Sequence, residues 1–595
     1  MKVADFIINY LADKGIKDIF IVYGGANGDL IDAFTRTDKT RYVCVMHEQA
    51  GGFAAEAYSK IGGNFGVAIA TSGPGGQNFL TPICNCFYDS VPCLFITGQV
   101  KTEFLKNDEK LRQVGFQETD IISIVDSVTK YAKLVTDPQS IKYELEKAIF
   151  LAKDKRPGPV LLDLPIDVQK AEIDETKLIG FDSEVCKPSY DIELIDKKID
   201  EFLNDLSKSK RPIILVGMGV RIAGGIDKLL ELGNKLKIPM IPTWNATDIV
   251  TSDLPYYAGR IGTFGGKGRN FSIQNSDLLL AIGSRISGRI TGSRLDSFAR
   301  GAKKYIVDVD EALLQRKLQQ IPFDENIYSD AKLFLERFLL KLKNYHIPDF
   351  SEWTNKVVEW RDKYDPVLKE YYEQKEPVNP YVFFRILSQE MKGNDILVGD
   401  CGGNIIINNH AFETKKGQKV ITNNGNSPMG YSFAASIGAY LASDKIQNVV
   451  CTIGDGGFNM NIQELQTVKN YCLKFKTFII NNHCYGITRA FQRNNFEGRM
   501  EACGPKGYNP PDFIKIAEAY GVKTFSINNQ DKLKEKIREV LEYDGPVICD
   551  VNCHDWDAYE PRIVGWNTPL EDVTPLLSEE ELRANMFIEP IIERE

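Results

Sequence analysis

Two polar residues with glycines beside them have the types and spacing of a metal–phosphate site. Asp455 stands in the run Gly-Asp-Gly-Gly (454–457), and Asn482 follows 27 residues later. Carboxylate and amide oxygens are hard ligands of the kind Mg²⁺ takes, and the ion completes its shell with water and phosphates. Gly456 and Gly457 would let the backbone approach a phosphate closely. The pattern predicts a magnesium–diphosphate site; the alternative is a tight turn in which Asp455 caps a helix.

The segments around these residues predict how they are brought together. Residues 449–453 and 477–480 are short, apolar and rich in β-branched side chains, which is typical of buried parallel strands. Between them, one face of an amphipathic helix is predicted from Ile462, Leu465, Val468 and Cys472. Ligands of doubly wound sheets bind outside the carboxyl ends of the strands. We therefore expect Asp455 and Asn482 to converge at one sheet edge.

The N-terminal part of the chain has a similar order of elements. A strand at 19–22 precedes a glycine loop, and a strand at 42–45 precedes Glu48 and a helix of small residues. A strand, a glycine loop, a helix and a second strand then follow between 66 and 97, in the order seen around Asp455 but without the acidic residue. We predict two similar doubly wound domains, one at each end of the chain. On its own, Glu48 is read as a residue that favours a helix N-terminus.

Composition bounds the class of protein. A chain of 595 residues exceeds one hydrophobic core, so three or four domains are expected. The net charge of −9 and the lack of a basic stripe argue against nucleic-acid binding. No apolar run reaches a membrane span, and the N-terminus has no signal-sequence pattern. Without a membrane span, no membrane partner is expected. The twelve cysteines lack metal or disulfide spacing, which favours a reducing compartment and hence a cytoplasmic location.

The middle of the chain predicts a nucleotide-type fold. Strands are expected at 278–282, before Arg285, and at 305–307, before Asp308. An acid at a strand end can bind a ribose, and arginines can bind a diphosphate. A polar linker is expected at 172–189 and a charged helical connector at 351–374. The expected domains are 1–170, 188–345 and 376–555, followed by a tail, 556–595, which is either a lid over a cleft or surface packing.

The glycine–aspartate run and the distant Asn481-Asn482 resemble the signature of thiamine-diphosphate enzymes. Up to about residue 555, the chain resembles the acetohydroxyacid (acetolactate) synthases. This resemblance implies an α/β protein of three doubly wound parallel-sheet domains: pyrimidine-binding, central nucleotide-fold and diphosphate-binding. It implies thiamine diphosphate and Mg²⁺, with FAD as a candidate in the central domain. It also implies that the metal is held by Asp455, Asn482 and the carbonyl of Cys484.

The resemblance also implies roles for individual residues. Glu48 would exchange a proton with N1′ of the aminopyrimidine, which needs a carboxyl whose pKa is raised by a partly dry site. Met429 would wedge under the cofactor, although core packing is the commoner role of a methionine. Phe116, Gln117 and His483 would border the substrates. The other implied cofactor contacts are Gly25, Gly403, Asn404, the Ser427 carbonyl, Gly454, Gly456, Gly457, Tyr485, Gly486 and, for flavin, Arg289.

Three departures from the family pattern bear on function. Ser287 and Gly288 replace two acidic residues before the flavin arginine, so the central domain is either an FAD site or a vestigial nucleotide fold. Gly403 and Asn404 replace a glutamine and a histidine near the diphosphate. Phe491 replaces a tryptophan that favours 2-ketobutyrate as acceptor, which argues against branched-chain amino-acid synthesis.

The expected reaction is decarboxylation of a 2-oxo acid, with pyruvate as the expected donor, and ligation of the two-carbon unit to an acceptor carbonyl. The partners are therefore small molecules, and the family places Glu48 and Asp455 of one site in different subunits of a homodimer or homotetramer. The alternatives are a keto-sugar acceptor for surface glycans, a simple decarboxylase, a flavin-dependent pyruvate oxidase and a non-catalytic scaffold.

Overall fold

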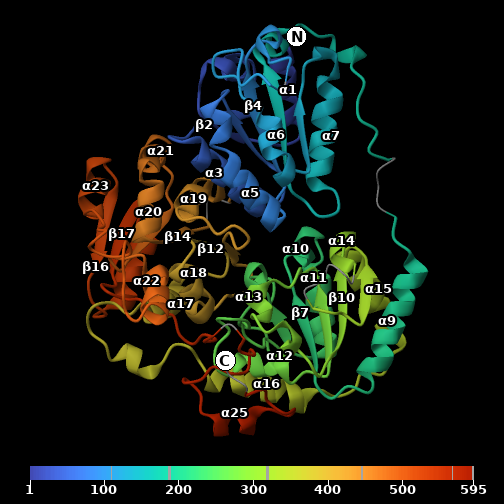
Figure 1. The fold of residues 1–595 in the computed structure, drawn as a ribbon, viewed down its shortest axis with the longest axis vertical. Coiled ribbons are helices and arrows are strands. Elements are labelled where there is room, and N and C mark those ends of the chain that lie inside the picture. The colour runs from blue at the N-terminus through green and yellow to red at the C-terminus, as the bar shows by residue number, and fades with distance from the viewer. Residues whose placement is uncertain (109, 185–188, 316–320, 444–446, 566, 593–595) are drawn as a thin grey trace.

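The computed structural model describes residues 1–595 except 109, 185–188, 316–320, 444–446, 566 and 593–595. The chain is built on three parallel sheets, which lie in the separate blue, green and orange-to-red regions of Figure 1. Helices lie against each sheet, as expected for parallel strands joined by crossover helices. This confirms the predicted α/β class. Residues 185–188 of the predicted linker lie outside the described residues.

The N-terminal sheet has six strands in the order β2-β1-β3-β4-β6-β5. The strands are β1 Asp18–Ile21, β2 Arg41–Cys44, β3 Gly66–Ala70, β4 Cys93–Gln99, β5 Tyr131–Leu134 and β6 Pro159–Pro165. The helices are α1 Val3–Asp13, α2 Gly28–Ala33, α3 Glu48–Gly62, α4 Pro74–Gln77, α5 Leu80–Asp89, α6 Ile121–Val125, α7 Ile141–Lys153 and α8 Ile166–Lys170. Strands β1, β3 and β4 are buried throughout, which matches their apolar sequences.

The central sheet has five strands in the order β11-β10-β9-β7-β8. The strands are β7 Pro212–Val216, β8 Met240–Pro242, β9 Leu278–Ile282, β10 Lys303–Asp308 and β11 Glu325–Tyr328. The helices are α9 Ile192–Leu206, α10 Gly219–Ile222, α11 Ile226–Leu236, α12 Arg269–Gln274, α13 Gly288–Thr291, α14 Glu311–Leu314 and α15 Ala331–Lys341. The predicted helical connector is α16, Ser351–Lys363, followed by a 3₁₀ turn at Lys369–Tyr372.

The C-terminal sheet repeats the topology of the first, with the order β13-β12-β14-β15-β17-β16. The strands are β12 Ile396–Gly399, β13 Lys419–Ile421, β14 Val449–Gly454, β15 Lys476–Asn481, β16 Lys523–Ile527 and β17 Val547–Asn552. The helices are α17 Pro380–Glu390, α18 Gly403–Ala411, α19 Tyr431–Ala442, α20 Asp455–Met460, α21 Leu465–Asn470, α22 Gly486–Asn495, α23 Phe513–Ala519 and α24 Leu533–Glu542. Renumbered from one, this order is identical to that of the N-terminal sheet, which confirms the predicted internal repeat.

The amphipathic helix predicted between Asp455 and Asn482 is wrong in detail. It is divided into α20, a 3₁₀ turn at Ile462–Glu464, and α21. Leu465 and Val468 are buried as predicted, but Cys472 lies beyond α21 and is exposed. The reason is local: Cys472 takes a left-handed φ of 49° that ends the helical run.

The N- and C-terminal domains share a core through α3 and α19, which lie side by side in Figure 1. Small residues allow this: a Cβ added at Gly438 of α19 would lie 1.8 Å from the carbonyl oxygen of Ala54 in α3. The sequence predicted small residues on α3 for close packing, and the structure shows the partner. None of the helices in the described part of the chain has the length and apolar character needed to span a bilayer.

The C-terminal tail packs on the central domain, which excludes its prediction as mere surface packing. Helix α25, Glu579–Asn585, follows Ser578, which caps it. Asn275 of the central domain donates to the Asn585 carbonyl at 2.9 Å, and the buried Glu571 pairs with Arg300 at 2.7 Å. Leu570, Val573, Leu577 and Leu582 of the tail are all buried. The tail is therefore part of the folded core.

Candidate active site

A cavity lies at the carboxyl ends of β12, β14 and β15, at the sheet edge where ligands of this fold bind. Eleven of the sequence-predicted residues line it: Gly403, Asn404, Met429, Gly454, Asp455, Gly456, Gly457, Asn482, Cys484, Tyr485 and Gly486. The structure thus brings together nearly all the residues predicted to hold the diphosphate and metal. Ser427 does not line the cavity but lies two residues before Met429.

Asp455 is one of two carboxylates that line this cavity; the other is Asp400. Asp455 is 2% exposed, and its Oδ1 accepts the Gly456 amide at 2.9 Å. Its Oδ2 is buried and has no hydrogen-bond partner among the described residues. Burial raises the pKa of the carboxyl to about 7. A buried carboxylate with one oxygen unused is the donor that a divalent cation would satisfy.

Two amide side chains, of Asn482 and Asn404, also line the cavity. Asn482 donates its Nδ2 to the Trp556 carbonyl at 2.6 Å, so its acceptor oxygen is left for another partner. Asn404 accepts a hydrogen bond from Thr452, but its Nδ2 is buried and no described acceptor meets it. It belongs to the first turn of α18, where free amides and the helix dipole favour an anion. These features fit a diphosphate held beside a cation.

The glycines of the cavity are required by close neighbours. A Cβ at Gly456 would lie 2.5 Å from the Tyr485 ring, and a Cβ at Gly486 would lie 2.1 Å from the Tyr559 hydroxyl. A Cβ at Gly403 would lie 2.2 Å from the Tyr559 ring. Tyr559, from the tail, thus occupies the space that a side chain at position 403 would need. Trp556 also lines the cavity, so the segment predicted as tail contributes to this site.

Glu48 lies at the carboxyl end of the N-terminal sheet, as the first residue of α3. Its Oε2 accepts Asn78 Nδ2 at 2.9 Å, and a Cβ at Gly75 would approach its Oε1 to 3.2 Å. The glycine loop after β3 therefore lies against the carboxyl. Gly25 is exposed in the turn after β1.

The predicted substrate residues lie near these two regions. Phe116 is 87% exposed, and Gln117 has a left-handed φ of 62°. The Gln117 carbonyl would lie 3.0 Å from a Cβ at Gly73, so this turn packs on the same glycine loop that approaches Glu48. His483 does not line the diphosphate cavity; its ring packs on His554 with centroids 4.9 Å apart.

Within one chain, the two halves of the predicted site are not brought together. None of the described residues that line the diphosphate cavity comes from the N-terminal domain. Glu48 and the glycine loop after β3 therefore line no part of this cavity in their own subunit. This arrangement agrees with a site completed by a second chain.

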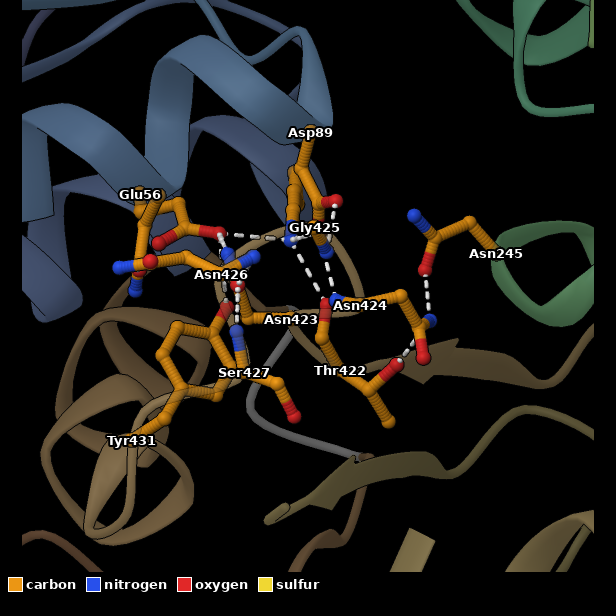
Figure 2. A network of polar contacts seen from close by, with 12 residues as sticks. Glu56, Asp89, Asn245, Thr422, Asn423, Asn424, Gly425, Asn426, Ser427 and Tyr431 are labelled. Carbon is orange, nitrogen blue, oxygen red and sulfur yellow. Dashed lines mark hydrogen bonds and ion pairs between the residues drawn. The ribbon is translucent and has the colours of Figure 1, made fainter. Parts of the chain in front are cut away.

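A buried network links α3 to the loop that precedes Met429 (Figure 2). Glu56 accepts Asn423 Nδ2 at 3.1 Å, and the Asn423 Oδ1 accepts the Ser427 amide at 2.9 Å. Asp89 of α5 accepts the amides of Asn424 and Gly425 at 3.1 and 2.8 Å. These bonds hold Ser427 in its left-handed conformation, φ 55°. The helix that begins with Glu48 thus also fixes the loop on the other domain.

Sequence reasoning missed several residues of this framework. Lys60 bridges Glu56 at 2.7 Å and donates to the Thr422 carbonyl at 2.8 Å. Glu464 accepts the Met46 amide at 3.1 Å, two residues before Glu48, and its burial raises the pKa of that carboxyl to about 7. The spacing of four residues between Glu56 and Lys60 is typical of an ion pair on one face of a helix. Nothing in the sequence indicated that it would be buried between domains.

A second cavity lies between the central and N-terminal domains. Its lining includes the predicted Arg285, Arg289 and Asp308, together with Gly219 and Trp244. The Arg289 guanidinium lies 5.1 Å from the Trp244 ring centroid, and burial lowers its pKa. Asp308 ends β10, and its Oδ1 accepts the Asp310 amide at 3.0 Å. The strand-end acid and the arginines of the nucleotide prediction therefore share one cavity.

Comparison with known proteins identifies the family. The thiamine pyrophosphate enzyme models match residues 1–124 (N-terminal TPP binding domain), 199–338 (central domain) and 400–551 (C-terminal TPP binding domain). A probable acetolactate synthase large subunit of Methanocaldococcus jannaschii is 33% identical, with 99% of this chain and 98% of the relative covered. The acetolactate synthase large subunit of Lactococcus lactis is 31% identical, with 92% of each chain covered. The isozyme 2 large subunit of Escherichia coli is 30% identical, with 95% and 97% covered. Both the models and the relatives extend over the domains that form the two half-sites, and the chain belongs to the acetolactate synthase-like thiamine pyrophosphate enzymes.

Proposed function

We propose that this protein is a thiamine-diphosphate-dependent carboligase that decarboxylates a 2-oxo acid, with pyruvate as donor, and joins the two-carbon unit to an acceptor carbonyl. The observation that carries the proposal is the unused, buried Oδ2 of Asp455 in a cavity lined by glycines. It lies at the edge of a sheet whose topological twin presents Glu48.

The residues that would hold the cofactor's diphosphate and cation follow from the cavity. Asp455, the Asn482 side chain and the Cys484 carbonyl would bind Mg²⁺, and the ion takes its other ligands from phosphate and water. The Asn404 Nδ2 and the backbone at 454–457 would bind phosphate oxygens. When bound, thiamine diphosphate supplies the electron sink that makes loss of carbon dioxide and formation of a new carbon–carbon bond feasible.

The N-terminal half-site would supply the proton chemistry. Glu48 would hold and exchange a proton at N1′ of the aminopyrimidine, oriented by its bond from Asn78. The Ser427 carbonyl would accept a hydrogen bond from the 4′-amino group. Met429 would support the bent cofactor from below. The network of Glu56, Asn423 and Asp89 keeps these two contacts in place.

The separation of the two half-sites bears on how many subunits are needed to form one site. Because no described N-terminal residue lines the diphosphate cavity of its own chain, we propose that Glu48 and the glycine loop come from a second subunit. A homodimer is the smallest such assembly, and a homotetramer would contain two of these pairs.

One observation favours an acceptor other than 2-ketobutyrate. Phe491 of α22 is 47% exposed, and it is smaller than the tryptophan that the resemblance places there. A smaller, half-exposed ring leaves room for an acceptor bulkier than a simple 2-oxo acid. A keto-sugar is therefore the second candidate acceptor, beside a second molecule of pyruvate.

We also propose that the central cavity binds FAD. Asp308 at the end of β10 would bind a ribose, while Arg285 and Arg289 would bind the diphosphate. This holds despite Ser287 and Gly288, because the two arginines still line the cavity. The eleven cysteines of the described residues are all free, which supports a cytoplasmic location.

The test is to denature the purified protein and identify the small molecules released. Thiamine diphosphate at about one per chain supports the proposal, and its absence from protein purified with Mg²⁺ and the cofactor would contradict it. Release of flavin tests the central cavity separately. Incubation with pyruvate then distinguishes the reactions: acetolactate indicates ligation, acetaldehyde simple decarboxylation, and acetate with an electron acceptor oxidation.

A further inference from the structure

A third cavity, of about 300 Å³, lies where the central domain meets the C-terminal domain, and it shares no lining residue with the diphosphate or flavin cavities. Its walls are a loop of the central domain, the first residue of α12, the end of α16, the end of α17 and the segment after α18. Four cationic side chains line it: Arg260, Arg269, Arg361 and Lys415.

Arg269 is the unusual group in this cavity. It is only 7% exposed, and its Nε is buried without an acceptor. No described residue accepts a hydrogen bond from its guanidinium or forms an ion pair with it. Burial lowers the pKa of Arg269, which reflects the cost of keeping a charge there. The Asp365 carboxylate offsets part of this cost from beyond ion-pair distance, while Arg260 and Arg385 add to it. A buried cation with no counter-ion in direct contact is unfavourable unless a partner neutralises it.

Arg260 adds a second buried cation beside it. This residue is 4% exposed, and its Nη1 donates to the carbonyls of Asn408 and Asn409, each at 3.0 Å. These carbonyls lie at the C-terminal end of α18, where the helix dipole offsets part of the charge, but they supply no counter-ion. Its Nε is buried and meets no acceptor among the described residues. The two arginines also repel one another, since both are cations that line the same cavity.

The carboxylates around the cavity are engaged elsewhere. Asp365 forms two bonds to Arg385, at 2.8 and 2.9 Å, and Asp362 binds Arg361 at 2.7 Å. Glu413 is more than half exposed and lies 3.5 Å from Arg385. Asp253 accepts the Thr251 hydroxyl at 2.6 Å and the Lys416 amide at 3.2 Å. Neither Arg260 nor Arg269 has a carboxylate at ion-pair distance within the described chain.

His410 forms a neutral part of the wall. Its Nε2 lies 2.6 Å from the Phe264 carbonyl, and its Nδ1 lies 3.0 Å from the Tyr381 hydroxyl. Burial, with Arg269 and Arg260 nearby, lowers its pKa to about 3, so the ring stays uncharged at neutral pH. The positive charge of the cavity therefore rests on the three arginines and Lys415.

We propose that this cavity binds a phosphate group, either inorganic phosphate or the phosphoryl group of a small metabolite, between Arg260 and Arg269. Guanidinium groups match the geometry of phosphate oxygens, and a dianion would balance both charges. Chloride would balance the charge but offers no set of oxygens for the guanidinium forks. The proposal is independent of the proposed reaction.

Binding here would brace the junction between two domains. Arg260 belongs to the central domain, while the carbonyls that it holds end α18 of the C-terminal domain. The opposite end of α18 carries Gly403 and Asn404, which line the diphosphate cavity. A phosphate between the arginines would fix Arg260 and, through it, the far end of this helix.

The experiment measures thermal unfolding of the full-length protein, saturated with Mg²⁺ and thiamine diphosphate, against inorganic phosphate at constant ionic strength set with potassium chloride. The wild type should show a saturable rise in Tm, as expected for a ligand that binds only the folded state. Arg269→Gln should weaken the apparent affinity at least 10-fold. The control Arg499→Gln, an exposed arginine, should behave as the wild type.

The variants also guard against a folding artefact and against phosphate bound elsewhere. Because Arg269→Gln removes a buried unpaired charge, its Tm without phosphate should equal or exceed that of the wild type. Phosphate bound in the diphosphate cavity would act on both proteins alike, so only the difference between them counts. A response that is absent, unsaturable or equal in Arg269→Gln would overturn the proposal.

A second arm distinguishes the two sources of phosphate. The protein is titrated with glycerol 3-phosphate. If this compound binds more tightly than inorganic phosphate, the cavity is assigned to a phosphorylated metabolite. Tighter binding of inorganic phosphate would assign it to the free ion. Isothermal titration with Arg260→Gln, which should also lose the binding, checks that both arginines take part.

Discussion

The two end domains have the same sheet and different chemistry. In each, six parallel strands follow the same order, and the helix after the second strand, α3 or α19, packs against its counterpart. The N-terminal domain places its acid, Glu48, at the start of α3. The C-terminal domain places its acid, Asp455, after the third strand, where the N-terminal domain has Thr71 and a glycine loop.

This difference shows how one topology serves two tasks. Both sheets direct their strand ends and glycine loops to one edge, which is a general property of the fold. The function of each edge then depends on a single acid. Asp455 is buried with one unused oxygen, which suits a cation, whereas Glu48 is half-buried and accepts a hydrogen bond from Asn78, which suits proton exchange. Substitutions at these positions should therefore separate cofactor binding from cofactor activation.

The largest effect should come from the C-terminal acid. Asp455→Ala removes the carboxylate that we assign to the metal, so Mg²⁺ and thiamine diphosphate should no longer be retained. Loss of groups that merely orient metal ligands weakens metal binding roughly 10- to 100-fold, and loss of a ligand should cost more. The measurement is thiamine diphosphate per chain after gel filtration.

Thr71→Ala is the matched control at the equivalent strand end. Its hydroxyl accepts the Ala26 amide at 3.1 Å, and we assign it no contact with the metal or the diphosphate. This variant should retain the cofactor. If Asp455→Ala retained thiamine diphosphate at the wild-type level, the metal-binding role that distinguishes the C-terminal sheet edge from the N-terminal one would be wrong.

The next effect concerns the N-terminal acid. Glu48→Gln keeps the shape of the side chain but cannot exchange the proton at N1′, so cofactor retention should be nearly unchanged. Exchange of the cofactor's C2 proton should slow about 100-fold or more, the usual scale of acid–base catalysis. The exchange is followed by NMR after quenching in deuterated buffer. Full turnover in Glu48→Gln would show that the assigned role is wrong.

A smaller effect should come from the network that joins the two domains. Glu56→Gln keeps an acceptor for Asn423 but removes the charge that pairs with buried Lys60. The loop before Met429 should become less well fixed, and kcat should fall roughly 10-fold while cofactor retention changes little. Glu144→Gln, a buried glutamate that accepts the Tyr131 hydroxyl in the same domain, should leave kcat unchanged. Equal losses in both variants would indicate general destabilisation.

The smallest effect is a pH dependence of thermal stability. It arises from Glu464, which accepts the Met46 amide two residues before Glu48. Burial raises the pKa of Glu464 from 4.5 to about 7, so the folded state holds this proton more tightly than the unfolded state. Its contribution to stability therefore falls as the pH rises from about 4.5 to about 7. Between pH 5 and 8, the Tm of the wild type should decline more steeply than that of Glu464→Gln, which cannot titrate. Parallel Tm curves would exclude this contribution.

Local sequence patterns were sufficient for most of the fold and for one half-site. Runs such as 449–453 and 278–282 are apolar and β-branched because both faces of a parallel strand are buried, and they became β14 and β9. Asp455 and Asn482 converged because parallel strands share one carboxyl edge. The similarity of the first and last domains could also be predicted, because both show the same order of strand, glycine loop, helix and strand.

What could not be predicted depends on contacts between distant segments. Tyr559 fills the space beside Gly403, and no local pattern links residues so far apart. The burial of Glu56, Lys60 and Glu464 depends on the packing of one end domain on the other. The helix expected up to Cys472 ended early because a left-handed residue has no unambiguous signal when it is not glycine.

The most direct test of the central claim uses two inactive variants. Glu48→Gln and Asp455→Ala subunits, co-expressed with different tags and purified as the hybrid, place both intact acids at one site and both altered acids at the other. If each site takes Glu48 from one chain and Asp455 from its partner, the hybrid should recover roughly half of the wild-type turnover, whereas each parent is inactive. A hybrid as inactive as its parents would contradict a site shared between two chains.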